Sequence, residues 1–402
     1  MNEVYIFNGI RTPFGRHGGA LARIRTDELL AGCIREVVKR AGIDGSLIED
    51  VIAGDTNQAG EDCRNVARNA SLLAGLPVTV AGQTVNRLCG SGIAAILDCT
   101  RALRCGEGQL MIAAGVESMS RAPWVMSKAD AAFSRDQEMF DSTIGWRFSN
   151  PRFIGQFGGD TMPETADNIA KDLGISREDS DRLALASQQK YARARAAGYY
   201  AEELMTVEVP AERRKDPPQQ VRDDEHPRVD VTLESLTKLK PLQKDGVVTA
   251  GNASGINDGA GALLIGTKAM GEKLGLKPRA RIVAGAVAGV EPRVMGLGPV
   301  PASQKVLQRA GLQLKDIDVL ELNEAFATQV LGCLKMLQLP FDDARVNPNG
   351  GAIAIGHPLG ASGIRLVLTA LRQLEASRKH FALCTMCIGL GQGIAIVLER
   401  IT

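Results

Sequence analysis

The feature that most constrains the fold is an internal repeat with an offset of 268–271 residues. Four short segments recur in the same order in the two halves of the chain. The matched pairs are Arg40-Ala41-Gly42 with Arg309-Ala310-Gly311, Asp50-Val51 with Asp318-Val319, Ser91-Gly92-Ile93 with Ser362-Gly363-Ile364, and the apolar run 110–115 with 381–386. A nearly constant offset over four matches predicts two copies of one structural unit.

Each copy shows strands alternating with helices. Apolar residues between positions 29 and 38 recur at helical spacing, and Gly42 follows where this helix would end. Short apolar runs, typical of strands buried on both faces, occupy 51–53, 110–114, 319–322 and 394–398. This alternation predicts an α/β fold of duplicated units, with layered helices and a mostly parallel, mixed sheet.

A segment of different character separates the copies. Residues 121–245 are rich in charge and proline, and Ser176 followed by Asp179 predicts the start of a helix there. We expect 1–120, completed by 246–272, to form the first half of the core and 273–402 the second. The segment 121–245 is then an inserted loop domain, either a ligand-binding lid or a decorative surface subdomain.

Composition narrows the class of partner. Lys and Arg total 47 and Asp and Glu total 46, so the net charge of +1 argues against a nucleic-acid or membrane-surface partner. No apolar run approaches a membrane span, and the N-terminus shows no signal peptide. The eight cysteines lack regular spacing, so we expect most to be reduced thiols in a cytoplasmic protein.

Cys89 stands just before a run of small and helix-forming residues, Gly90 to Ile96. The N-terminus of a helix offers free N–H groups and the positive end of the dipole, which favour a thiolate. Because an unperturbed thiol is only slightly ionised at neutral pH, a nearby base would help. The segment is equally compatible with a buried structural cysteine.

His357 is one of four histidines and lies in a stretch crowded with glycine, 349–363. Gly356-His357-Pro358 indicates a sharp turn that enters a helix. A lone histidine is more often structural, but a structural one rarely needs so many neighbouring glycines. We therefore interpret His357 as a functional residue.

Cys384 and Cys387 form a Cys-x-x-Cys pair before a glycine-rich turn. A zinc site lacks a second pair of ligands at suitable spacing. A redox dithiol remains open, as does one reactive cysteine at a strand end beside an oxyanion site made by backbone N–H groups. Asn323 ends an apolar run and is by itself weak evidence for a site.

Together these blocks resemble the thiolase family over essentially the whole chain. Cys89 in Asn-Arg-Leu-Cys-Gly-Ser-Gly, Asn323 in Asn-Glu-Ala-Phe, His357 in Gly-His-Pro and Cys387 in Cys-Ile-Gly occur in the family's order. The resemblance implies a duplicated α/β core with an inserted loop domain, and a homodimer or homotetramer. It implies no metal and no organic cofactor, because coenzyme A is a substrate.

The resemblance also implies a mechanism. Cys89 would attack the 3-oxo group of a 3-oxoacyl-CoA, and His357 would take its proton. Cys387 would protonate the departing acetyl-CoA enolate, and free CoA would then release the acyl group from Cys89. His357 with a water held by Asn323 would form one oxyanion hole, and the N–H groups of Cys89 and Gly389 the other.

Five further residues match family positions that contact coenzyme A. Ser254 matches a pantetheine-binding serine, and Arg228 matches an arginine that stacks on adenine. The residues that match the lining of the pantetheine tunnel are Met162, Met295 and Phe326.

The segments 145–151, 160–166 and 382–387 are similar to those of thiolases that act on 3-oxoadipyl-CoA in bacterial aromatic catabolism. That substrate carries a distal carboxylate, which needs a cation such as Arg147 or Arg152 in the inserted segment. The nearest alternative is an acetoacetyl-CoA or broad-range 3-oxoacyl-CoA thiolase, although Thr161 replaces a histidine frequent there. A decarboxylating ketoacyl synthase, which lacks a cysteine at the position of Cys387, and a non-catalytic relative are more distant alternatives.

Overall fold

The structure is a computed structural model that describes residues 2–211, 213 and 215–401. Met1 and Thr402, at the outer ends of the predicted halves, lie outside the described residues, as do Glu212 and Arg214 of the predicted insertion.

One large sheet runs through the described part of the chain. Its strands are β1 (Val4–Arg11), β2 (Gly15–Arg16), β3 (Asp50–Gly54), β4 (Ala81–Val85), β5 (Leu110–Ser118), β10 (Asn257–Thr267), β11 (Ala280–Gly289), β12 (Val319–Leu322), β13 (Phe381–Ile388) and β14 (Gln392–Arg400). The order is β12-β13-β14-β11-β1-β10-β5-β3-β4, and β2 pairs with β10.

The topology repeats about the centre of the sheet, as the sequence predicts. The series β3, β5, β10, β1 in one half corresponds to β12, β13, β14, β11 in the other. The two series meet where β1 pairs with β11 through Tyr5 and Ile6. The α/β fold of duplicated units is confirmed. The predicted boundaries of the three parts stay a prediction, although β10, which follows the predicted insertion, does pair with β1 and β5.

The prediction that the sheet is mostly parallel is wrong. Among the described strands of this sheet, only β3–β4, β3–β5 and β12–β13 pair in parallel, and the other pairings are antiparallel. One cause is local, because β13 and β14 form a hairpin around Leu390 and Gly391, whose φ angles are 66° and 84°. The other is non-local, because β10 inserts between β1 and β5 from a distant part of the chain.

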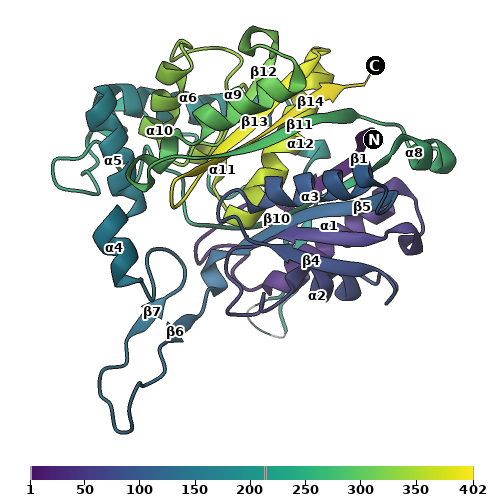
Figure 1. Cartoon of the computed structure of the whole chain (residues 1–402), viewed down its shortest axis with the longest axis horizontal. Coiled ribbons are helices and arrows are strands. Elements are labelled where there is room, and N and C mark those ends of the chain that lie inside the picture. Colours follow the sequence, from purple (N-terminus) through teal and green to yellow (C-terminus); the bar gives the residue numbers. More distant parts are fainter. Residues whose placement is uncertain (1, 212, 214, 402) are drawn as a thin grey trace.

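Helices cover both faces of the sheet halves. They are α1 (Thr26–Ala41), α2 (Val66–Leu73), α3 (Ser91–Cys105), α8 (Lys268–Leu274), α9 (Pro299–Ala310), α10 (Ala327–Met336), α11 (Ala352–Ile355) and α12 (Leu359–Ser377). Helices α3 and α12 pack on each other and on strands of both halves, whereas α1 and α2 cover the first half and α9 and α10 the second. Figure 1 shows the purple-to-blue first half below the green-to-yellow second half.

The matched glycines of the repeat lie where α3 crosses α12. A Cβ added to Gly92 would lie 3.1 Å from the Cα of Gly363, and one added to Gly363 would lie 2.3 Å from the nitrogen of Ile93. Only glycine permits this approach of two backbones. Because the crossing is close to both helix N-termini, the residues that precede the two helices are brought to one region of the molecule.

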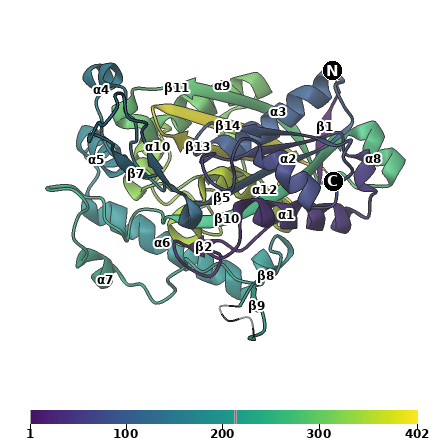
Figure 2. The same ribbon diagram turned by 90° about the horizontal axis from the view of Figure 1, so that it is seen from below.

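The chain between the halves forms smaller elements, of which β6, β7, α4 and α5 lie at one end of the molecule (Figure 1) and α6, α7, β8 and β9 extend along one side (Figure 2). They are β6 (Trp124–Met126), β7 (Met139–Asp141), α4 (Pro151–Phe157), α5 (Met162–Leu173), α6 (Arg177–Ala196), β8 (Val207–Val209), β9 (Gln219–Val221) and α7 (Leu233–Thr237). Ser176 caps α6 by accepting the N–H of Asp179, as predicted. The β6–β7 hairpin projects furthest from the body (Figure 1). No helix among the described residues has both the length and the apolar character to span a bilayer.

Candidate active site

Cys89 lies in a tight turn that joins β4 to α3. Leu88 has a φ of 46°, a strained value for a side chain of this size, and Gly90 caps the helix. The hydroxyl of Ser91 donates to the carbonyl of Leu88 and accepts the N–H of Arg87, which locks the turn. Cys89 is therefore held at the N-terminus of α3, as predicted, and keeps partial solvent exposure.

The environment of Cys89 favours the protonated thiol over the thiolate. Burial raises the pKa of Cys89 to about 11, although the backbone N–H groups of Gly389 and of Cys89 itself lower it. The prediction that the helix terminus favours the thiolate is wrong in net direction, because desolvation exceeds the effect of these donors. A base must therefore take the proton when the sulfur reacts.

The raised pKa predicts how Cys89 responds to alkylation. Because only the thiolate reacts, modification by iodoacetamide should keep rising between pH 7 and pH 10, by about tenfold per pH unit. Peptide mass spectrometry can follow Cys89, with the exposed Cys63 as the reference for reagent exposure. A plateau for Cys89 near pH 8 would contradict the expected pKa.

His357 lies two residues before α12 and is almost fully buried. Gly356, with a φ of 109°, makes the turn, and its position leaves no room for a side chain beside Asn257. The backbone N–H of His357 donates to the Oδ1 of Asn257 at 2.9 Å. Burial, and then the charge of Arg365, lower the pKa of His357 to about 3, so that its ring is neutral at physiological pH.

The tautomer of His357 follows from its partner. The hydroxyl of Ser362 lies 2.6 Å from the Nδ1 of His357 and donates its own proton to the carbonyl of Pro358. Ser362 must therefore accept a proton from Nδ1. Nε2 is left unprotonated and can accept a hydrogen bond or a proton, which is the state that a general base needs.

Asn323 is fully buried beside Nε2 of His357. Its Nδ2 lies 3.4 Å from the Nε2 of His357, and its backbone N–H donates to the carbonyl of Thr385. Its Oδ1 has no hydrogen-bond partner. A buried amide with an unused acceptor beside a general base is an arrangement that can bind a further polar group, such as a water or a substrate oxygen.

Cys387 lies near the end of β13, and burial followed by the adjacent Cys89 sulfur raises its pKa well above the usual value. Cys384 belongs to the same strand but packs in a different apolar cluster. Residues three apart in a strand are about 10 Å apart, beyond the limit of about 7 Å for a disulfide. The redox dithiol is thereby excluded, and no group of metal-ligating side chains occurs among the described residues.

The structure brings the predicted tunnel residues together. Met295 and Phe326 form one buried cluster with Cys387, and the partly buried Met162 packs against it, although these residues come from different parts of the chain. A Cβ added to Gly389 would lie 3.3 Å from the Cδ1 of Leu88 and 3.8 Å from the sulfur of Met162. The apolar cluster therefore adjoins the turn that carries Cys89.

The other two predicted CoA contacts lie further out. The N–H of Ser254 donates to the carbonyl of Ala325, which places Ser254 next to Phe326. Arg228 is exposed, and its backbone N–H donates to Gln188 on α6. Their roles remain predictions that follow from the family resemblance.

Three residues of the site are missing from the sequence-based prediction. Ser362 lies five residues after His357, in the same glycine-rich segment, so the sequence could have indicated it. Asn257 lies 100 residues from His357, and no sequence pattern connects the two. Glu117, whose pKa is raised to about 7 by burial, accepts N–H groups of Thr56 and Gly360 and so ties β3 to the start of α12.

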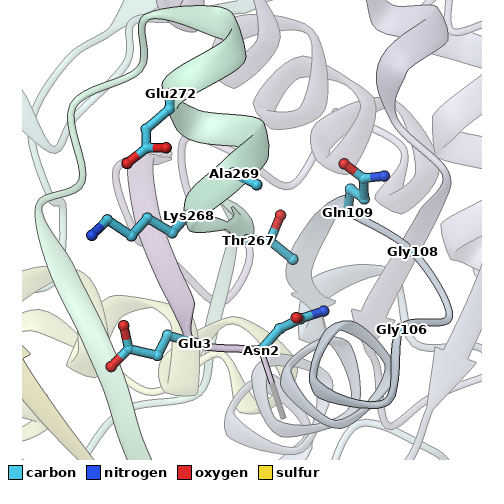
Figure 3. Close-up of a pocket in the computed structure, with 9 residues that line it drawn as sticks. All are labelled: Asn2, Glu3, Gly106, Gly108, Gln109, Thr267, Lys268, Ala269 and Glu272. Atoms are coloured by element: carbon cyan, nitrogen blue, oxygen red, sulfur yellow. The ribbon is translucent and has the colours of Figure 1, made fainter.

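A surface hollow lies apart from these residues. As Figure 3 shows, it is formed by the segment before β1, the α3–β5 connection and α8, with Glu3, Lys268 and Glu272 as its charged side chains. Its lining includes no predicted site residue, no cysteine and no histidine. We therefore assign the candidate chemistry to the residues around Cys89 and His357.

Two family models match nearly the whole chain. The model described as "Thiolase, N-terminal domain" matches residues 4–269, and "Thiolase, C-terminal domain" matches residues 276–400. These two matches adjoin at α8.

Individual proteins are also similar over their full length. The chain is 59% identical to the 3-oxoadipyl-CoA/3-oxo-5,6-dehydrosuberyl-CoA thiolase of Escherichia coli and 55% identical to a beta-ketoadipyl-CoA thiolase of Acinetobacter baylyi, in each case over 100% of both chains. The crystal structure of the Bacillus anthracis acetyl-CoA acetyltransferase superposes with a TM-score of 0.93 at 37% identity, covering 100% of this chain and 99% of that chain.

Proposed function

The chain belongs to the thiolase family of acyltransferases, and we propose that it cleaves 3-oxoadipyl-CoA with CoA to give succinyl-CoA and acetyl-CoA. The observation that supports this choice of substrate is the 59% identity, over the full length, to a protein named as a 3-oxoadipyl-CoA thiolase. The similar acetyl-CoA acetyltransferase structure has 37% identity. An acetoacetyl-CoA or broad-range thiolase is the alternative that the test below separates.

The first half of the reaction is transfer of the acyl group to Cys89. The sulfur attacks C3 of the substrate while the unprotonated Nε2 of His357 takes the thiol proton. The oxygen on C3 becomes an oxyanion next to Cys89, where the N–H groups of Cys89 and Gly389 are directed toward the sulfur. These donors stabilise the charge as it forms.

The bond between C2 and C3 then breaks, leaving a succinyl thioester on Cys89 and the enolate of acetyl-CoA. Cys387 gives its proton to C2, since its raised pKa keeps the thiol protonated until a strongly basic carbon appears. The enolate oxygen is stabilised by protonated His357 and by the amide of Asn323. CoA then enters, and its thiol gives its proton to the Cys387 thiolate. Its sulfur takes the succinyl group from Cys89, whose departing thiolate recovers the proton held by His357.

The substrate assignment is tested by CoA-dependent cleavage of 3-oxoadipyl-CoA and acetoacetyl-CoA side by side. The kcat/KM for 3-oxoadipyl-CoA should exceed that for acetoacetyl-CoA by about 100-fold if a distal carboxylate is recognised by a charged group. Products are identified by mass. Comparable values for the two substrates would assign the protein to the broad-range alternative.

We expect Ser362 to affect the reaction only by orienting the ring of His357. Replacing Ser362 with alanine removes the partner of Nδ1, so we expect kcat/KM to fall by about tenfold, the cost of one buried hydrogen bond. Ser303 on α9 is a matched control, because its hydroxyl is fully buried without a partner. Equal losses in the Ser362→Ala and Ser303→Ala variants would show that Ser362 has only a packing role.

A homodimer or larger homo-oligomer forms part of the proposal. Strand β4 ends the sheet, and its outer edge is unpaired in the described residues. Leu72 and Leu73 of α2 and Val78 are exposed beside it, the last at 77%. An open edge with apolar neighbours favours pairing with a second copy.

The free thiols of all eight cysteines support the proposed cytoplasmic location.

A further inference from the structure

We propose that Arg147 binds the distal carboxylate of the acyl group and so selects substrates that end in a negative charge. This inference rests on the proposed function, because only such a substrate places a carboxylate in the acyl site. Arg147 lies in the connection from β7 to α4 (Figure 1).

The backbone around Arg147 is held in an unusual conformation. Gly145 has a φ of 92°, and Phe148, on the other side of Arg147, has a φ of 50°. Phe148 packs edge-on against Phe140 of β7 with 5.1 Å between ring centroids. A bulky residue in the left-handed region is costly and persists only where surrounding contacts enforce it. The turn therefore presents Arg147 in a fixed position.

Hydrogen bonds tie this turn to segments of the active site. The indole N–H of Trp146 donates to the carbonyl of Asp160, two residues before Met162, which packs against the apolar cluster around Cys387. Five residues before Arg147, the hydroxyl of Ser142 accepts from the amide of Asn57, which follows β3. Arg147 is thus anchored between the segment that leads to Met162 and the one that leads from β3.

A second path leads from the same turn to the general base. The hydroxyl of Thr143 donates to the carbonyl of Met119. The sulfur of Met119 accepts the N–H of Asn257, whose side chain in turn accepts the N–H of His357. The turn that carries Arg147 is therefore linked to the catalytic histidine by a short chain of contacts.

The charge of Arg147 has no carboxylate partner among the described residues. The half-buried guanidinium donates only to the carbonyl of Ser142, over 3.4 Å. Two other half-buried arginines, Arg121 and Arg345, form ion pairs with carboxylates. Arg87 and Arg104 do not, but they donate to an amide oxygen and to two carbonyls, whereas Arg147 has the single long contact. A planar guanidinium is matched in shape and charge by a carboxylate, which it can bind through two parallel hydrogen bonds. The missing partner is supplied by the distal end of a 3-oxoadipyl group.

Arg152, the other arginine considered for this role, also lacks a carboxylate partner among the described residues, but it is more exposed than Arg147. It lies on α4, and its side chain is exposed. It therefore serves as a matched control of the same type, five positions along the chain.

The test compares two substrates of equal length, 3-oxoadipyl-CoA and 3-oxohexanoyl-CoA, which has a methyl group in place of the carboxylate. In Arg147→Ala, kcat/KM for 3-oxoadipyl-CoA should fall by about 30-fold, the range for a hydrogen bond to a charged group. The loss should appear mainly in KM. The value for 3-oxohexanoyl-CoA should stay within about twofold of the wild type, and Arg152→Ala should change neither substrate.

Arg147→Lys keeps the charge and should recover a large part of the loss. If Arg147→Ala does not fold, as circular dichroism would show, Arg147→Gln provides the same comparison with a side chain of similar length. An equal loss for both substrates, or no loss for 3-oxoadipyl-CoA, would overturn the role of Arg147 and leave the proposed function intact. A wild-type enzyme that cleaves 3-oxohexanoyl-CoA as well as 3-oxoadipyl-CoA would instead overturn the proposed function, and this inference with it.

Discussion

Replacing Cys89 with alanine is expected to abolish thiolysis, with a loss in kcat of about 10⁴-fold or more. No other described thiol can replace Cys89, because the turn at Leu88 and the N–H groups of Cys89 and Gly389 define the one place where the acyl carbon can be attacked. The remaining residues would still bind the CoA ester. We therefore expect KM to change far less than kcat, which steady-state kinetics on 3-oxoadipyl-CoA would measure.

The control for this variant is Cys63→Ala, since Cys63 is exposed. Its activity should equal that of the wild type. Turnover in Cys89→Ala within about tenfold of the wild type, where a loss of about 10⁴-fold is expected, would contradict the assignment of Cys89 as the nucleophile.

Replacing Cys387 with alanine should separate the two halves of the reaction. Carbon–carbon cleavage needs a proton for C2 and should fall by about 10³-fold, within the range for loss of a general acid. Acylation of Cys89 by a simple thioester forms no carbanion, so Cys387 keeps its proton and His357 passes the thiol proton between Cys89 and CoA. We therefore expect exchange of labelled CoA into acetyl-CoA, which passes through acetyl-Cys89, to fall much less than cleavage.

Cys384→Ala is the matched control, because it removes a buried thiol from the same strand but from a different apolar cluster. It should lower stability and leave both reactions measurable. If Cys387→Ala lost cleavage and exchange to the same extent, Cys387 would have a structural role and another group would protonate C2.

The duplicated fold was predictable because its signals are local. The offset of the repeat follows from strand and helix ends such as Gly42 and Gly311, which close α1 and α9 with φ angles of 65° and 68°. The direction of the strands was not predictable in the same way. Alternation of helices and strands suggests parallel crossovers, but β10 pairs with β1 and β5 after the whole insertion has intervened.

In the candidate site, too, features with a local sequence signal were predictable and those that depend on distant segments were not. Cys89, His357 and Cys387 each carry a local sequence signal, and the structure places Cys89 beside Cys387 and His357 beside Asn323. The partner that orients the backbone of His357 is Asn257, which only the folded chain brings near. The raised pKa of Cys89 could not be predicted from the sequence either, because it depends on how completely distant segments bury the sulfur.

The most direct test of the central claim is the identity of the acyl group that the enzyme carries. The wild-type protein is mixed with 3-oxoadipyl-CoA in the absence of free CoA, quenched in acid, digested and examined by peptide mass spectrometry. We predict a succinyl group on the peptide that contains Cys89, released as succinyl-CoA when CoA is added before the quench. A protein without this adduct, or with the acyl group on Cys387, would contradict both the proposed substrate and the assigned nucleophile.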